Sequence, residues 1–258
     1  MKLYWRYFII QCKSQLQHKA SFLMLVFGQF LATFTSFLGI YFIMSRFQQV
    51  AGFTTAEVLL NFSIISFSYA MAEMFARGFD SFAQIIGNGE FDRMLVRPKN
   101  LFVQILGSRI ELSRLGRLIQ AFLMFAWVFA NSNITWTADK ILTISLMLIG
   151  GIIVFASLFL LYASLCFFTL EGLELINIFT DGGREFGQYP FSIYGEGVLK
   201  LLTFIIPLAL VQYYPLLYLT GRSQQSALMF APILATLFLI PVYNFWCFAL
   251  KHYQSTGS

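Results

Sequence analysis

Residues 141–168 read ILTISLMLIGGIIVFASLFLLYASLCFF and contain no Asp, Glu, Lys or Arg. A helix needs about 20 mainly apolar residues to cross roughly 30 Å of hydrocarbon, and it satisfies its own backbone hydrogen bonds while doing so. This stretch is both long enough and apolar enough to cross. It therefore predicts a transmembrane helix.

The rest of the chain has the same character. Hydrophobic residues make up 58% of the sequence and charged residues 11%, and the mean hydropathy is +0.72. A soluble domain of this size could not bury so many large apolar side chains. We predict an all-α, polytopic membrane protein in which residues 1–258 form one transmembrane domain with six transmembrane helices. The expected spans are residues 21–45, 57–79, 110–131, 141–168, 199–220 and 227–250.

The basic residues are unevenly distributed between the two ends of these spans. If the N-terminus is cytoplasmic, only Arg46, Lys140 and Arg222 of the 17 Lys and Arg residues fall on the outer side. Cytoplasmic segments of membrane proteins carry the excess of Lys and Arg. The pattern therefore predicts that both termini are cytoplasmic. The net charge of +5 reflects the flanks of membrane spans rather than a surface for nucleic acid.

Residues 1–20 combine basic and aromatic side chains, among them Tyr4, Trp5 and Arg6. Trp and Tyr favour the headgroup level of a bilayer, and basic amphipathic helices lie in its interface. No small-residue cleavage site follows, which argues against a removed export signal. We expect an N-terminal interfacial helix on the cytoplasmic side.

The cytoplasmic segment 80–100 reads DSFAQIIGNGEFDRMLVRPKN. Gly87 and Gly89 predict a turn, the acidic residues after it favour the start of a short helix, and Pro98 ends that helix. Phe91 and Leu95 share one helical face. Such a helix is either a packed loop or a docking element for a cytoplasmic partner, and composition alone leaves both open.

A second non-spanning segment, residues 169–198, is rich in acidic residues and ends in the aromatic string that contains Tyr189 and Tyr194. Paired carboxylates can bind metal or exchange protons, but no His lies near them. We predict a cytoplasmic amphipathic helix that lies at the interface and is followed by a turn, with no metal site.

Polar side chains inside predicted spans are costly in lipid and tend to face a partner helix or a cavity. We hypothesise a substrate pathway along such residues, although helix packing alone is the commoner explanation for small polar residues. The pathway residues are Gln29, Thr33, Asn61, Gln212 and Tyr214.

Glu73 is the acidic residue placed deepest in a predicted span, and Arg77 follows one helical turn later. An ion pair within the helix, near the inner end of the span, is the favoured interpretation. A role in proton relay is the alternative.

Enzyme chemistry is not indicated. His18 and His252 are the only histidines, and both lie outside the predicted spans. The chain has no His-Glu-x-x-His zinc motif, no Gly-x-Ser-x-Gly nucleophile elbow and no glycine-rich phosphate loop. We expect no catalytic residues, no metal site and no cofactor in this chain. A secondary transporter or channel is an alternative, but it would need charged or broken midplane helices related by a repeat.

Three strings resemble a known family: GEFDRMLVRP at 89–98, ARGFD at 76–80 and YPFSIYG at 189–195. They are similar to the membrane subunits of type-2 ABC exporters, in the bacterial permease branch with six spans. The resemblance implies that 89–98 is the coupling helix, which sits in a cleft of an ATP-binding subunit. The residues implied at that contact are Gly89, Glu90, Phe91, Asp92, Arg93, Leu95 and Arg97.

The same resemblance implies the rest of the assembly. ATP and Mg would be bound by separate ATP-binding subunits, in two copies, and the permease would pair with an identical or related permease in a bacterial inner membrane. Transport would be export of a substrate that the strings do not identify. Many relatives carry an outer re-entrant hairpin between the last two spans, whereas residues 220–227 leave room only for a turn. We expect any outer gate within residues 208–220, which Pro215 interrupts.

Overall fold

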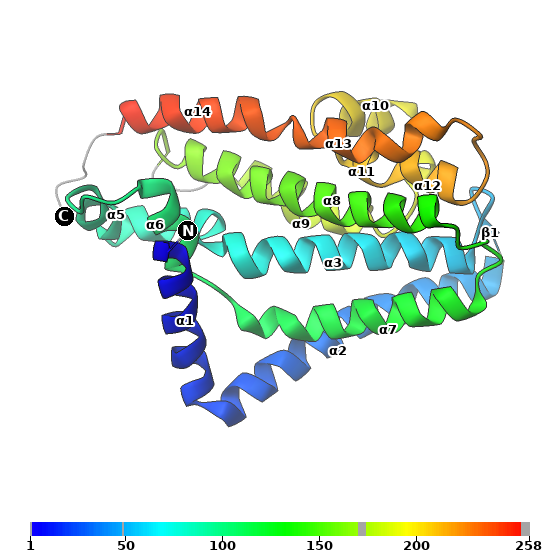
Figure 1. The fold of residues 1–258 in the computed structure, drawn as a ribbon, viewed down its shortest axis with the longest axis horizontal. Coiled ribbons are helices and arrows are strands. Elements are labelled where there is room, and N and C mark those ends of the chain that lie inside the picture. Colours follow the sequence, from blue (N-terminus) through cyan, green and yellow to red (C-terminus); the bar gives the residue numbers. More distant parts are fainter. Residues whose placement is uncertain (1, 48, 170–173, 254–258) are drawn as a thin grey trace.

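The computed structural model describes residues 2–47, 49–169 and 174–253, and most of them are helical. Long helices extend along one common direction (Figure 1). They are α2 (Lys19–Phe47), α3 (Thr55–Asp80), α7 (Leu115–Asn131) and α8 (Ala138–Leu165), followed near the C-terminus by α13 (Ala231–Thr236) and α14 (Leu239–Lys251). Short 3-10 turns, Leu112–Arg114 and Ser226–Phe230, lead into α7 and α13.

Within the described ranges, five helical segments are long and apolar enough to cross a membrane. They overlap the predicted spans at 21–45, 57–79, 110–131, 141–168 and 227–250. The prediction of an all-α polytopic membrane protein is therefore confirmed.

The predicted fifth span, residues 199–220, is not one straight helix. α10 (Glu196–Phe204) meets the pair α11 (Leu208–Val211) and α12 (Tyr213–Leu219) at an angle of 86°. Pro207 lies at the break, where its ring blocks continuation of the preceding helix and its missing N–H removes a backbone donor. Counted as one broken span, these helices raise the number of candidate crossings to six.

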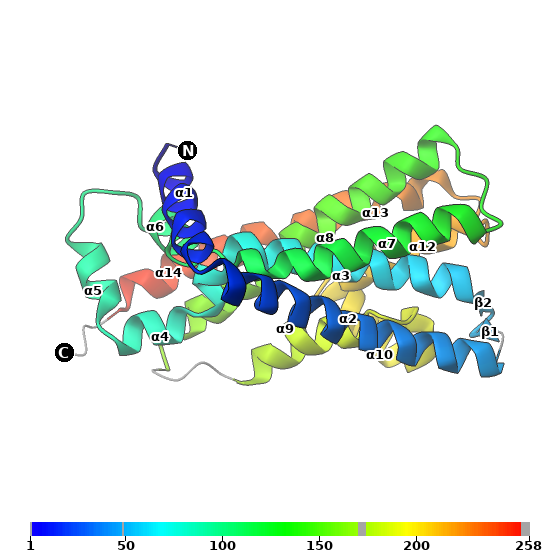
Figure 2. The same ribbon diagram turned by 90° about the horizontal axis from the view of Figure 1, so that it is seen from below.

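The amphipathic helix expected within 169–198 is present as α9 (Glu174–Phe186), one side of which packs against α3 and α8 (Figure 2), and its place at a membrane interface stays a prediction. The Tyr69 hydroxyl, near the middle of α3, donates to Asp181 at 2.6 Å. One and a half turns later, the carbonyl oxygen of Gly187 accepts from Asn61, which is nearer the start of α3. These two bonds join one side of the segment to α3, while Ile178, Glu185 and Phe186 on α9 are exposed. Residues 170–173 fall outside the described part.

α9 and α11 meet inside the bundle. Gly183 of α9 lies against Leu208 at the start of α11, and α12 ends near the first residues of α3.

The two ends of the bundle are built differently, as Figure 1 shows. One end, called the β-hairpin end below, carries the short antiparallel pair β1 (Gln49–Val50) and β2 (Phe53–Thr54). The other, called the α5 end, carries three short helices between α3 and α7. These are α4 (Phe82–Gly87), α5 (Glu90–Leu95) and α6 (Leu101–Ser108).

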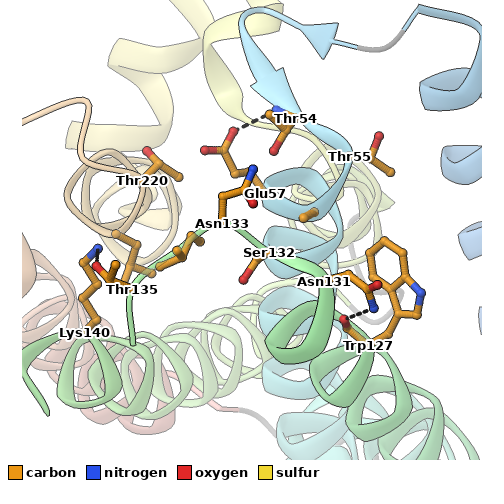
Figure 3. A pocket seen from close by; sticks show the side chains of 13 residues that line it. Thr54, Thr55, Glu57, Trp127, Asn131, Ser132, Asn133, Thr135, Lys140 and Thr220 are labelled. Atoms are coloured by element: carbon orange, nitrogen blue, oxygen red, sulfur yellow. Dashed lines mark hydrogen bonds between the residues drawn. The ribbon is translucent and has the colours of Figure 1, made fainter. Parts of the chain in front are cut away.

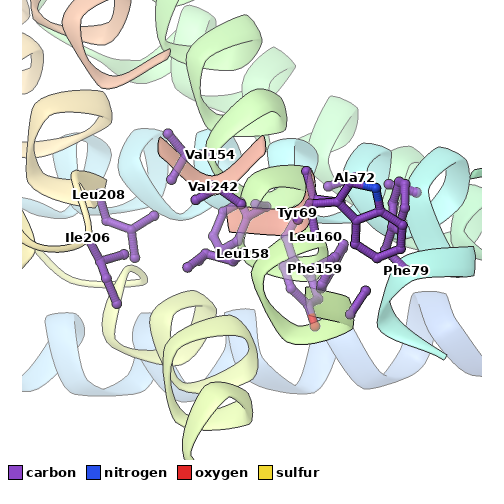
Figure 4. Packing of buried hydrophobic residues seen from close by; sticks show 14 of the residues in the cluster. Tyr69, Ala72, Phe79, Val154, Leu158, Phe159, Leu160, Ile206, Leu208 and Val242 are labelled. Atoms are coloured by element: carbon purple, nitrogen blue, oxygen red, sulfur yellow. The ribbon is translucent and has the colours of Figure 1, made fainter. Parts of the chain in front are cut away.

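Buried residues gather around α3, which has more buried positions than its neighbours. Figure 4 shows Tyr69, Phe159 and Leu158 packed together, with Phe79 and Val242 nearby. Burial of apolar area contributes roughly 25 cal/mol per Å² relative to water. Within lipid that term is absent, so close packing must hold the helices together.

Glycines permit that close packing at two contacts. A Cβ at Gly116 in α7 would overlap the carbonyl oxygen of Val26 in α2, and one at Gly78 in α3 would overlap the carbonyl oxygen of Ile105 in α6. Small residues at such points let helix backbones approach closely in membranes.

The N-terminal helix, α1 (Lys2–Gln17), runs across the direction of the bundle at the α5 end (Figure 1). Its Tyr4 hydroxyl donates to the carbonyl of Phe75, and Gln11 donates to that of Ser108 at 2.8 Å. Burial raises the pKa of Tyr4 to about 12, so its hydroxyl stays a neutral donor. The predicted helix therefore exists, and its place at a membrane interface stays a prediction.

Candidate functional site

A buried ionic cluster lies where α3, α7 and the turn before α7 meet. Glu73 is only 3% exposed, and its two oxygens are shared by three arginines. Arg77 and Arg114 approach Oε1 at 3.3 and 3.2 Å, and Arg117 pairs with Oε2. The predicted pair between Glu73 and Arg77 is confirmed. The pairing of Glu73 with Arg114 and Arg117 was not predicted. The available signal was that these two arginines lie three residues apart at the start of a predicted span.

The cluster continues toward the α5 end. Arg77 also pairs with Asp80 and with Glu111, and Arg114 lies 2.7 Å from Glu111. A buried charge is costly unless paired and hydrogen-bonded, and a shared network meets that condition. The arrangement ties the last turns of α3 to the start of α7.

Two arginines from different helices also meet at Tyr69. The guanidinium carbons of Arg117 and Arg184 lie 5.8 and 5.3 Å from the centre of its ring, within the usual cation–π range. Tyr69 in turn donates to Asp181 of α9. This tyrosine therefore connects α9 to the cluster around Glu73.

Two of the hypothesised pathway residues act as structural donors inside the bundle. The side-chain amides of Asn61 and Gln212 both donate to the carbonyl of Gly187, each at 2.8 Å, and Gln212 also reaches the carbonyl of Tyr189 at 3.2 Å. Both side chains are fully buried. They satisfy the backbone where α9 ends, which is a packing role.

The other pathway residues are dispersed. Tyr214 lies 3.3 Å from the hydroxyl of Thr203, across the bend between α10 and α11. Thr33 borders a small cavity between α2, α3, α7 and α9. Gln29 lies one turn before it and holds a buried side-chain oxygen without a partner. Of the five residues, Thr33 lines this cavity, and the substrate pathway stays a prediction.

At the α5 end, the predicted turn and short helix are both present. Gly89 has φ of +65°, a left-handed conformation that glycine adopts at little cost, and α5 begins directly after it. Asn100 caps the next helix by accepting from the backbone N–H of Val103 at 3.2 Å. The segment is thus a chain of short, capped helices.

Phe91 does not lie on an exposed face of α5 together with Leu95, although helical periodicity places them on the same side. Its side chain is fully buried among the rings of Phe82, Phe167 and Tyr253. The expectation that it faces a partner is therefore corrected, because an aromatic ring at this position fills a pocket of the chain itself. Leu95, one turn later, is 42% exposed.

The polar residues of α5, and Arg97 just after it, remain near the surface. Arg93 and Arg97 are exposed, Glu90 is half-buried, and Asp92 accepts from the Tyr253 hydroxyl at 3.0 Å. That last bond ties α5 to the residues just after α14. Of the predicted contact residues, Arg93, Leu95 and Arg97 are thus available to another molecule.

The β-hairpin end holds a polar pocket of about 420 Å³ (Figure 3). Glu57 accepts from the backbone N–H of Thr54 at 2.8 Å and pairs with Arg222 at the same distance, while Arg222 also donates to the carbonyl of Gly52. These contacts fasten the hairpin to the loop after α12. Thr220 and Lys140 complete the wall that Figure 3 shows.

No group of three or more His, Cys, Asp or Glu side chains within residues 2–47, 49–169 and 174–253 is placed to hold a metal ion. The cluster around Glu73 is built of ion pairs without a nucleophile and base in contact. Its chemistry is electrostatic anchoring between helices.

Comparison with protein-family models gives a match to the ABC-2 family transporter proteins over residues 30–257. The match begins within α2 and extends past the last described residue. Comparisons with curated proteins and with solved structures give no match.

Proposed function

Because the chain belongs to the ABC-2 transporter family, a family of membrane permeases, we propose that it is the export permease whose transport is driven by ATP hydrolysis in separate subunits. The observation that supports this most is the construction of the α5 end. At that end α5 and the residue Arg97 just after it expose basic side chains, and α5 is packed against the bundle.

The contacts that hold α5 against the bundle suit this helix to transmit movement. Phe91 packs against Phe82 of α4 and against Phe167, just after α8. The Tyr253 hydroxyl bonds to Asp92 on the same helix. A push on α5 would therefore move three parts of the bundle together, since packed aromatic rings deform little.

The exposed face of α5 is what a partner would touch. Arg93 lies on α5 and Arg97 lies two residues past its end, so that they flank Leu95 in sequence. Depressions beside Arg93 and Val96 give an acidic or apolar partner surface room to interlock. We assign Arg93, Leu95 and Arg97 to contact with the ATP-binding subunit, with Gly89, Glu90 and Asp92 shaping the helix.

The remaining features of the assembly belong to the same proposal. Two ATP-binding subunits would hold ATP and Mg, and the permease would pair with an identical or related permease. The α5 end would then be cytoplasmic, as the distribution of Lys and Arg favours, with both termini on that side of a bacterial inner membrane.

The test is co-purification. The tagged chain is expressed in membranes with the ATP-binding subunit encoded beside its gene, and bound subunit and vanadate-sensitive ATP hydrolysis are measured. Arg93→Glu should abolish both by reversing a charge at the contact. Arg46→Glu reverses an exposed charge at the β-hairpin end and should change neither. An ATP-binding subunit that never associates, or equal loss in both variants, contradicts the proposal.

A further inference from the structure

The cavity that Thr33 borders lies near the mid-length of two spanning helices. Its volume is about 110 Å³. Thr33 is close to the middle of α2, and Ser66 is close to the middle of α3. The polar side chains on its wall are those of Thr33, Ser36, Ser66, Arg117, Arg184 and Gln188.

Two of these side chains are guanidinium groups in a place where charge is costly. Arg117 is 13% exposed and Arg184 is 24% exposed. Each has a buried Nε without a hydrogen-bond partner. Arginines buried within a membrane domain are costly and generally mark functional sites.

The nearby carboxylates do not fill the cavity. Glu73 pairs with Arg117 but is shared with two other arginines. Glu185 pairs with Arg184 and is 51% exposed, so water competes for it. No Asp or Glu belongs to the wall itself. The hydroxyls of Thr33 and Ser36 already donate to backbone carbonyls, and Gln188 donates to Glu185. The wall therefore offers two guanidinium groups, each with a free buried Nε, and guanidinium groups are charge-assisted donors that bind a carboxylate or a phosphate.

The surroundings indicate how such an anion would arrive. α2 forms one side of the cavity and is the least buried of the candidate spans. Apolar side chains such as Phe27 and Leu31 are exposed along it, next to the cavity residues in sequence. The cavity has room for a headgroup but not for a hydrocarbon chain, which could lie along α2 in the lipid.

We propose that this cavity binds the oxyanion headgroup of an anionic amphiphile, a carboxylate or a phosphate, through Arg117 and Arg184. The inference deepens the proposed function, because it names a class of substrate for the permease. The shared chemistry is the oxyanion, and the source is either an amphiphile or a free anion.

The test uses the purified full chain in uncharged detergent, without any ATP-binding subunit, so that its outcome is independent of the ATPase experiment. Dodecyl phosphate, inorganic phosphate and 1-dodecanol are titrated, and the shift of the thermal unfolding midpoint gives each apparent Kd. Saturable binding of dodecyl phosphate is expected, with no saturable effect of dodecanol.

Variants locate the site. Arg184→Gln should raise the Kd for dodecyl phosphate at least about tenfold, by removing a charge-assisted donor. Ser66→Ala, a small change that leaves both charges, should raise it about two- to tenfold. Arg46→Gln, at the β-hairpin end, should leave it unchanged.

Each remaining outcome is decisive. Equal affinity for inorganic phosphate, with the same loss in Arg184→Gln, supports the oxyanion site but overturns the amphiphile as its source. Equal binding of dodecanol, no saturable binding of either phosphate, or a Kd unaffected by both cavity variants overturns the site.

Discussion

Replacing Glu73 with Gln keeps the shape of the side chain and removes the charge that three arginines share. Arg77 and Arg114 each retain Glu111 as a partner. Arg117 has Glu73 as its only carboxylate among the ion pairs of the described chain. The substitution therefore leaves one largely buried guanidinium uncompensated.

The loss of stability follows from the number of carboxylate partners that each arginine keeps. Breaking a buried ion pair by removing one partner typically destabilises a protein by about 3 to 5 kcal/mol. Arg117 retains slight exposure and its contact with Tyr69, so we expect the lower end, about 3 kcal/mol. Arg117→Gln added to Glu73→Gln removes the orphaned charge. The double variant should then be more stable than the sum of the single losses predicts, by about 2 kcal/mol.

The assay is reversible unfolding in mixed micelles, followed by tryptophan fluorescence, as a double-mutant cycle. The exposed pair of Glu196 and Lys200, 3.6 Å apart, provides the matched control cycle, and it should show no measurable coupling. A loss below about 1 kcal/mol for Glu73→Gln, or a coupling equal to that of the control pair, would refute the reasoning.

Two other substitutions test the packing. Gly116→Ala should force α2 and α7 apart, since its Cβ would meet the Val26 carbonyl, whereas Gly28→Ala has open space around it and should be tolerated. The melting temperatures of the two variants are compared with that of the unchanged protein. An equal decrease in both variants would contradict the close contact at Gly116. Phe91→Ala should destabilise the chain by about 3 to 5 kcal/mol because the ring is fully buried, and Leu95→Ala by much less. An equal effect at both positions would show that Phe91 is not an anchor.

The sequence was sufficient for the class of fold because its strongest signals are local. Uninterrupted apolar runs such as 141–168 predict helices that cross, and α2, α3 and α8 begin and end within about three residues of the predicted spans. The turn at Gly89 and the short helix after it were also predictable, since the left-handed residue and the first-turn acids are local features.

The contacts between α9 and the bundle were not predictable from local signals. The acidic residues of α9 are typical of a solvated segment, and the side of the helix that faces the bundle is held by residues that are distant in sequence. Asn61 and Gln212, far apart in sequence, both satisfy the carbonyl of Gly187, and Tyr69 bonds to Asp181. Such contacts depend on the tertiary structure and leave no periodic pattern.

Two errors concern single side chains. Phe91 and Leu95 lie one turn apart, so helical periodicity groups them, but it does not say which ring another part of the chain covers. Likewise, the sequence predicts Arg77 as the partner of Glu73, whereas burial brings Arg114 and Arg117 to the same carboxylate. Both outcomes depend on packing between elements.

The most direct test of the central claim, that α5 is the contact with an ATP-binding subunit, is site-specific photo-crosslinking in intact membranes. A photo-reactive amino acid is placed at Arg93, at Arg97 and, as a control, at Arg46. We expect a covalent adduct with the ATP-binding subunit from positions 93 and 97 and none from Arg46. No adduct from either position 93 or position 97, or an equal one from Arg46, would contradict the account.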